Sequence, residues 1–266
     1  MKKGIAASKG YAIGKAFIQE HEEIIITDEK VSDINAEKAK LQKALDDSKA
    51  QLTAIKDKTL AEIGEHEAQV FEAHLTLLDD PEFAGQMEMT IEGENVNAMK
   101  AVQATTDTVV MIFESIEDAY MRERAADIKD VSKRIISNLA GKGGSDFAIT
   151  EANTVVIAHD LTPSDTAQLD RTKVTGFLTN IGGRTSHSAI MARTLEIPAV
   201  VGLGDITTSI KNGDMVIVDG IEGIAIVNPS AEVIAEYEAK KSKFKEEQEE
   251  LKKLIDVKTV TKSGKR

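Results

Sequence analysis

With 266 residues, the chain is long enough to bury a sizeable core and to hold one or two domains. It contains no Cys, which excludes disulfides and Cys-based metal or redox sites and favours a cytoplasmic protein. A net charge of −12 and an aromatic content of 4% argue against nucleic acid as a partner. No segment approaches the ~18 apolar residues of a membrane helix, which argues against a membrane as a partner.

The first half of the chain changes from strand signals to helix signals. Short apolar runs separated by Gly predict strands within residues 4–28, one of them at 23–26. From Ser32 the chain is rich in Ala, Glu, Lys, Leu and Gln, which favours helices. The predicted helices are a long one from about residue 34 and others near 66–78, 81–91, 96–116 and 117–139.

Strand signals return in the second half, at residues 154–157, 174–178, 199–202, 215–218 and 224–227. Thr162 and Pro163 form a strong helix start, and Asn212-Gly213 predicts a hairpin turn. The predicted organisation is a strand-containing domain of residues 1–31 plus 144–230, interrupted by a helical segment of residues 32–143. Residues 231–266 are predicted to form a solvated linker helix and a tail, because Glu and Lys dominate there.

The strand at 174–178 leads into a turn that carries the main chemical signal. The turn and the start of the following helix read Gly182, Gly183, Arg184, Thr185, Ser186, His187 and Ser188. Two glycines permit a tight turn, and Thr185 and Ser186 are good helix caps. His187 is therefore predicted at the start of a helix, where backbone N–H groups and the helix dipole favour an anion.

His187 has three possible roles. A metal ligand would need further ligands, which the loop lacks. A general base would have to activate the adjacent Ser186 or Ser188, which side-chain directions disfavour. A nucleophile that becomes phosphorylated fits best. A capping histidine in an ordinary strand-turn-helix remains the alternative from the residues alone.

Residues 182–193 resemble the phosphohistidine signature of the phosphoenolpyruvate-utilising enzymes, in which the matching His carries the phosphoryl group. Residues 160–169 and 123–127 are similar to the N-terminal domain of enzyme I of the bacterial phosphoenolpyruvate:sugar phosphotransferase system. The resemblance covers nearly the whole chain. It implies an α/β swivelling phosphohistidine domain interrupted by an inserted α-helical bundle subdomain.

The resemblance implies that His187 is phosphorylated on Nε2 and that the Thr166 hydroxyl orients its ring. From the loop residues themselves, the positive charge of Arg184 is expected to help hold the phosphoryl group. The expected phosphate loop comprises Gly182, Gly183, Thr185, Ser186 and Ser188.

The inserted helices are expected to bind the phosphocarrier HPr. Residues 62–118 contain 14 Asp and Glu residues and one basic residue, Lys100, and such a surface attracts a basic partner. A solvated helical surface is the alternative explanation of this charge. The expected partner-binding residues are Glu65, His66, Phe71, Glu72, His74, Leu75, Leu78 and Arg124.

Enzyme I relatives continue into a C-terminal barrel that binds phosphoenolpyruvate and Mg²⁺ and mediates dimerisation. The resemblance therefore implies a monomer without a cofactor in this chain, which exchanges phosphoryl groups with HPr but is not phosphorylated by phosphoenolpyruvate alone. In the full-length protein, Mg²⁺ and the chain's own C-terminal domain are expected partners. The alternatives are the swivelling domain of a pyruvate phosphate dikinase or phosphoenolpyruvate synthase, and a non-enzymatic acidic helical adaptor.

Overall fold

The structure is a computed structural model that describes residues 1–19, 24–143, 149 and 151–255. The chain forms two compact units. The sheet unit comprises Met1–Gln19, Ile149–Asp160 and Asp170–Arg266, and the helical unit comprises Glu20–Ala148 and Leu161–Leu169. Among the residues described, no helix is long and apolar enough to cross a membrane.

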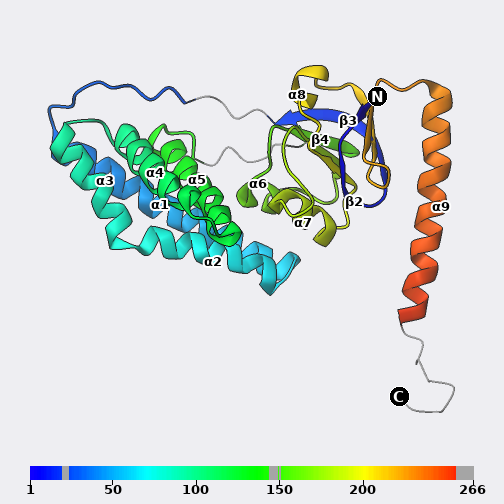
Figure 1. The fold of residues 1–266 in the computed structure, drawn as a ribbon, viewed down its shortest axis with the longest axis horizontal. Coiled ribbons are helices and arrows are strands. Elements are labelled where there is room, and N and C mark those ends of the chain that lie inside the picture. The colour runs from blue at the N-terminus through cyan, green and yellow to red at the C-terminus, as the bar shows by residue number, and fades with distance from the viewer. Residues whose placement is uncertain (20–23, 144–148, 150, 256–266) are drawn as a thin grey trace, which may run out of the picture. The chain divides into compact units, whose positions relative to one another are not determined.

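The sheet unit, which contains the strands labelled in Figure 1, is built on one mixed sheet. Its strands follow the order β1-β8-β7-β3-β4-β5-β6-β2. Strands β3, β4, β5 and β6 pair in parallel, and the remaining neighbours pair antiparallel. The central strand β4 is buried along its whole length, as its run of Val and Ile requires. The strands are β1 Lys2–Lys3, β2 Ile5–Ser8, β3 Tyr11–Gln19, β4 Thr154–Ala158, β5 Val174–Thr179, β6 Ala199–Val201, β7 Met215–Asp219 and β8 Ile224–Val227.

The two ends of this sheet come together because only Gly4 separates β1 from β2 in the chain. Gly4 donates a backbone hydrogen bond to the carbonyl of Gly223 at 2.8 Å. A Cβ at Gly4 would lie 2.6 Å from the carbonyl oxygen of Val201, so the close approach requires glycine. The sheet therefore curls around its apolar core instead of leaving two open edges.

Among the described residues, the helices of the sheet unit are α7 (His187–Thr194), α8 (Ile206–Ser209) and α9 (Ala231–Ile255). Parallel strands need a crossover connection, and α7 provides it between β5 and β6.

The last helix differs from the predicted solvated linker. In α9, Tyr237 is buried beside β3, and its ring and that of Phe244 both pack edge-on against Tyr11. Apolar residues spaced along one side of α9 provide this contact. The many Glu and Lys residues between them made the apolar side difficult to detect in the sequence.

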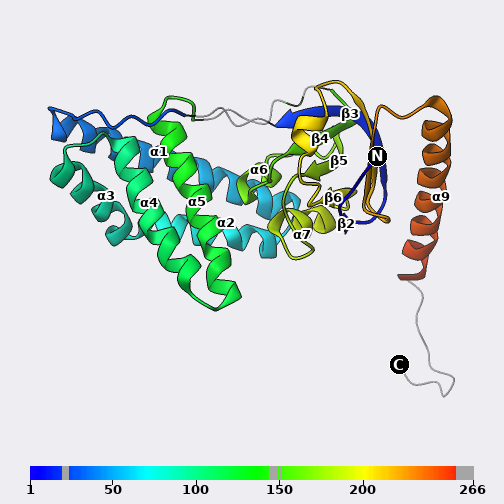
Figure 2. The ribbon, with the colours of Figure 1, turned by 45° about the horizontal axis from the view of Figure 1, so that its top comes forward.

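The helical unit is a bundle in which α4 and α5 lie side by side, as do α1 and α2 (Figures 1 and 2). Four of its helices begin at side-chain caps, which are Asp33, Asp80, Asn97 and Asp118. These helices therefore start close to the positions predicted from the sequence. The helices are α1 Ile34–Glu62, α2 Glu65–Asp79, α3 Pro81–Glu94, α4 Ala98–Ser115, α5 Ala119–Leu139 and α6 Pro163–Ala167.

Three predicted features are corrected. Residues 24–26 form no strand, and Glu23 lies outside the described residues. Asn212-Gly213 is a turn but not a hairpin, because the strand that follows it pairs with β3; the hairpin joins β7 and β8. Leu161–Leu169 was expected with the sheet but belongs to the helical unit, because Ala167 packs in the helical core.

Candidate functional site

The candidate site begins where β5 ends and the chain turns into α7. Gly182 adopts a φ of +119°, which residues with a side chain rarely adopt. A Cβ there would also lie 3.2 Å from Ser186 Oγ and 3.3 Å from Val201 Cβ. Gly183 differs, because a Cβ added there would meet open space. The first glycine is therefore required by the backbone of the turn, and the second leaves room beside it.

Ser186 fixes the start of the helix. Its Oγ accepts a hydrogen bond from the Ala189 N–H at 3.3 Å and donates one to the Gly183 carbonyl at 2.8 Å. Ser188 is buried, and its Oγ lies 3.1 Å from Ser186 Oγ. These bonds tie the glycine turn to the first turn of α7, so the loop has a defined conformation.

His187 is the first residue of α7 and is half-buried. Arg184 and Thr185 precede it and are both exposed to solvent. The site lies at the carboxyl ends of the parallel strands, where α/β sheets commonly bind ligands. The positive end of the α7 dipole and the Arg184 guanidinium both favour an anionic group beside the imidazole. The arrangement can hold and stabilise a group such as phosphate at His187.

In the ranges that the structure describes, no three His, Cys, Asp or Glu side chains are grouped in a way that would hold a metal ion.

Thr166 lies on α6, in the helical unit, and is 1% exposed. Its hydroxyl donates to the carbonyls of Thr162 and Pro163, at 3.1 and 3.0 Å. A capping box between Thr162 and Asp165 starts the same short helix. The hydroxyl is therefore held by the backbone of α6, and its direction depends on where α6 lies.

Comparison with known proteins identifies two matching regions. Residues 3–124 match the family described as PEP-utilising enzyme, N-terminal, and residues 150–223 match the PEP-utilising enzyme mobile domain, which includes the His187 turn. The phosphoenolpyruvate-protein phosphotransferase of Listeria innocua is 50% identical over 98% of this chain, and that of Staphylococcus carnosus is 48% identical over 98%. The chain spans only 46% of the length of each of these two relatives.

Solved structures also match this chain. A solution structure of enzyme I is 48% identical, covers 92% of this chain and all of its own, and superposes with a TM-score of 0.79. The chain belongs to the enzyme I family. An N-terminal domain named Enzyme 1 - Nitrogen, at 24% identity and a TM-score of 0.61, shares the fold. Membership of the enzyme I family supports the expected α/β fold with an inserted helical bundle over the dikinase and adaptor alternatives.

The enzyme I comparison does not test the expected partner-binding residues, but the structure locates them. Glu65, His66 and Glu72 are exposed on α2, and Leu75 is partly buried.

Three of these expected contact residues are corrected. Phe71, His74 and Leu78 are buried inside the helical unit, with exposed fractions of 2%, 1% and 9%. Their spacing, together with Ala68, follows the apolar stripe of α2, so they stabilise the bundle and do not form its surface.

The acidic segment is also less one-sided than its sequence indicates. Lysines from neighbouring helices lie against it: Lys38 pairs with Glu88 and Glu92, and Lys49 pairs with Asp79. Lys56 lies 4.0 Å from Glu72 at the α1–α2 contact. Lys38 and Glu92 are 54 positions apart in sequence, and Lys49 and Asp79 are 30 apart, so a count along residues 62–118 does not detect this compensation.

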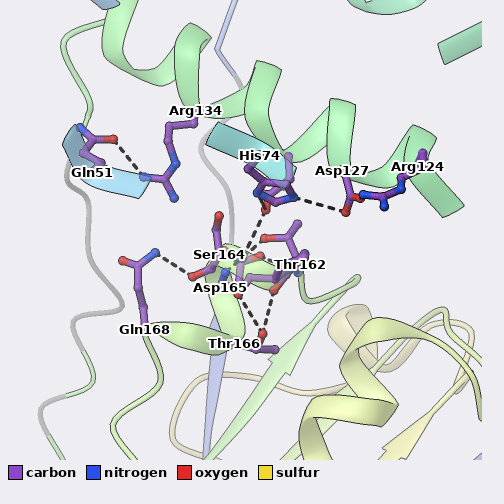
Figure 3. A network of polar contacts seen from close by, with 12 residues as sticks. Gln51, His74, Arg124, Asp127, Arg134, Thr162, Ser164, Asp165, Thr166 and Gln168 are labelled. Atoms are coloured by element: carbon purple, nitrogen blue, oxygen red, sulfur yellow. Dashed lines mark hydrogen bonds and ion pairs between the residues drawn. The ribbon is translucent and has the colours of Figure 1, made fainter. Parts of the chain in front are cut away.

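Two carboxylates that sequence reasoning missed lie beside His74. Asp127 faces His74 (Figure 3), with its Oδ1 3.3 Å from His74 Nε2. Asp130 Oδ2 is 3.9 Å from His74 Nδ1. Arg124, an expected partner-binding residue, lies with its Nη1 3.4 Å from Asp127 Oδ2. The available signal was the position of His74 on an apolar stripe, because a buried imidazole needs polar partners.

Proposed function

We propose that this chain transfers phosphoryl groups through a phosphohistidine at His187. The observation that carries the proposal is the position of His187 as the first residue of α7, directly after the Gly182 turn. The turn lies inside the region that matches the PEP-utilising enzyme mobile domain. The relatives named phosphoenolpyruvate-protein phosphotransferase indicate the donor and the class of acceptor.

In the proposed step, an unprotonated nitrogen of His187, Nε2 as the family implies, attacks the phosphorus of a phosphohistidine on HPr. A new N–P bond forms as the N–P bond of HPr breaks, and the electron pair returns to the imidazole of the carrier. The reverse step passes the group back to HPr. Positioning and charge stabilisation are the main catalytic requirements of such a transfer.

The loop would supply the charge stabilisation. The N-terminus of α7 and the Arg184 guanidinium would attract the phosphoryl oxygens, and the hydroxyls of Thr185, Ser186 and Ser188 are the nearby polar groups of the loop. Thr166 would orient the imidazole from α6, so that the correct ring nitrogen faces the phosphorus.

HPr is proposed to dock on the helical unit. The exposed acids Glu65 and Glu72 and the exposed His66 on α2 are the polar candidates, with the partly buried Leu75 beside them. Short-range contact would come from apolar side chains that are exposed and not from Phe71 or Leu78. Among the described residues of this unit, the exposed large apolar side chains are Ile25, Leu60, Met89, Met111 and Ile112.

The donor half of the reaction belongs to the proposal as well. Because the two relatives described above are about twice as long as this chain, we assign the phosphoenolpyruvate site and its Mg²⁺ to the remainder of their length. The 266-residue chain tested alone should then exchange phosphoryl groups with HPr but gain none from phosphoenolpyruvate. The cytoplasm is the proposed place of action.

The test is to incubate the chain with HPr carrying a radioactive phosphoryl group and to locate the label by mass spectrometry. His187→Ala should abolish labelling while leaving the circular dichroism spectrum unchanged. His159→Ala, which removes another histidine of the sheet unit, is the control and should remain labelled. Labelling of the His187→Ala protein, or of another histidine in the wild type, would contradict the proposal.

A further inference from the structure

A buried carboxylate on α5 holds the first turn of α6. Asp130 is 5% exposed, and its Oδ2 accepts a hydrogen bond from the backbone N–H of Ser164 at 3.2 Å. Ser164 is the second residue of α6, where a backbone N–H has no partner within its own helix. A hydrogen bond to a carboxylate is among the stronger ones in a protein. Asp130 therefore fixes α6 to α5 at a position where the helix cannot satisfy itself.

His74 lies beside this carboxylate. Its side chain is fully buried on α2, where it faces Asp127 (Figure 3) and also lies near Asp130. The two ring nitrogens face the two carboxylates: Nε2 lies 3.3 Å from Asp127 Oδ1, and Nδ1 lies 3.9 Å from Asp130 Oδ2. A buried carboxylate needs polar surroundings, and the imidazole places a polar ring beside Asp130 from a third helix.

The position of α6 determines the position of Thr166. The helix has only five residues, too few to be stable without tertiary contacts. Its contacts with the bundle include the packing of Ala167 in the helical core and the bond between Asp130 and the Ser164 N–H. Since the Thr166 hydroxyl is bonded to carbonyls of α6 itself, a shift of the helix would carry the hydroxyl with it.

We propose that Asp130 and His74 are positioning residues for phosphoryl transfer: together they fix α6 and, through it, the hydroxyl of Thr166. The inference rests on the proposed function, in which Thr166 orients His187. Neither side chain is proposed to touch the reacting atoms.

The first test measures α6 without any phosphoryl transfer. In Asp130→Ala, amide hydrogen exchange at Ser164 should accelerate by about 10–100-fold, the change expected for losing a hydrogen bond to a charged group. His74→Phe, which keeps a ring of similar shape, should accelerate it by a smaller factor. Unchanged exchange at Ser164 in Asp130→Ala would overturn the proposal.

A matched control lies on the same helix. Ser132 is buried on α5, and its Oγ is hydrogen-bonded to Thr106 Oγ1 of α4 at 2.7 Å. Ser132→Ala also removes a buried polar contact from α5, but it should leave exchange at Ser164 unchanged. Equal acceleration in Ser132→Ala would show that α6 responds to any loss of bundle stability, and would overturn the specific role of Asp130.

The second test is a double-mutant cycle on the rate of phosphoryl exchange with phosphorylated HPr. Asp130→Ala and Thr166→Val should each lower the rate at saturating HPr by about tenfold while leaving the KM for HPr nearly unchanged. The double variant should be no slower than the more affected single variant, because Asp130 acts through Thr166. Independent, multiplicative losses, or an effect on KM alone, would overturn the proposal.

Asp130→Asn keeps the cycle interpretable should Asp130→Ala prove unfolded. The amide oxygen that Asp130→Asn introduces can still accept a hydrogen bond from the Ser164 N–H, so Asp130→Asn should lower the rate of phosphoryl exchange less than Asp130→Ala does. A wild-type rate of phosphoryl exchange together with wild-type amide hydrogen exchange at Ser164 would overturn the role of the charge. Failure of the proposed function is distinguishable, because the wild-type chain would then exchange no phosphoryl group with HPr while the hydrogen-exchange comparison remained valid.

Discussion

At the scale of single residues, the two glycines of the His187 turn have different functions. Gly182 has a φ of +119° and two close neighbours around its missing Cβ, whereas Gly183 faces open space. Gly182→Ala should therefore lower the free energy of unfolding by about 1–3 kcal/mol through backbone strain and crowding. Gly183→Ala is the matched control and should change it by less than about 0.5 kcal/mol. Urea unfolding of both variants measures the difference, and equal costs would show that the turn does not depend on the conformation of Gly182.

At the scale of elements, α9 is held to the sheet by a buried tyrosine. The Tyr237 hydroxyl donates a hydrogen bond to Asp219 Oδ2 at 3.1 Å. Burial of the ring, and to a smaller extent the negative charge of Asp219, raises the pKa of Tyr237 above its usual 10.0. The folded state thus retains the phenolic proton more strongly than the unfolded state, so this stabilisation is complete below pH ~10 and is lost as the pH rises through the raised pKa. Tyr237→Phe should lower the free energy of unfolding by about 1.5–3 kcal/mol at pH 7. It should also reduce the loss of stability above pH ~10, which thermal unfolding across that pH range measures. The control is Tyr11→Phe, which alters the neighbouring ring and should lower the free energy of unfolding by less at pH 7. If the stability of Tyr237→Phe depended on alkaline pH as the wild type does, the role given to the Tyr237 hydroxyl would be contradicted.

At the scale of the whole molecule, the distribution of charge sets the expected kinetics of association. The net charge is −12, and α2 presents exposed acids although lysines of α1 offset part of the field. Association with HPr should slow as salt rises, mainly through k_on, because attraction is screened over a Debye length of ~8 Å at physiological ionic strength. Glu65→Lys should slow association at low salt more than Glu238→Lys, an exposed position on α9 that changes the net charge equally. Stopped-flow rates for the two variants test the docking surface, and equal slowing would indicate that total charge, not the helical unit, governs encounter.

Much of the site and the fold follows from local sequence. The glycine pair, the capping serine and the strand before them determine that His187 begins a helix, because turn and cap chemistry involve residues only a few positions apart. Helix boundaries were predictable for the same reason, since Asp33, Asp80 and Asn97 act on N–H groups two or three residues away. The resemblance in residues 182–193 then favoured a phosphorylated His187 over a capping histidine.

Tertiary structure decided which side of each element is buried and what pairs with it. The charge-rich sequence of α9 predicted a solvated linker helix, yet packing buries Tyr237 against the sheet. His74 could not be separated from exposed His66 by residue type, and its carboxylate partners lie more than fifty positions away. The attachment of α6 to the helices likewise depends on Asp130, 34 residues from Ser164. Burial and electrostatic pairing depend on distance in space, and only the folded chain brings together residues so far apart in sequence.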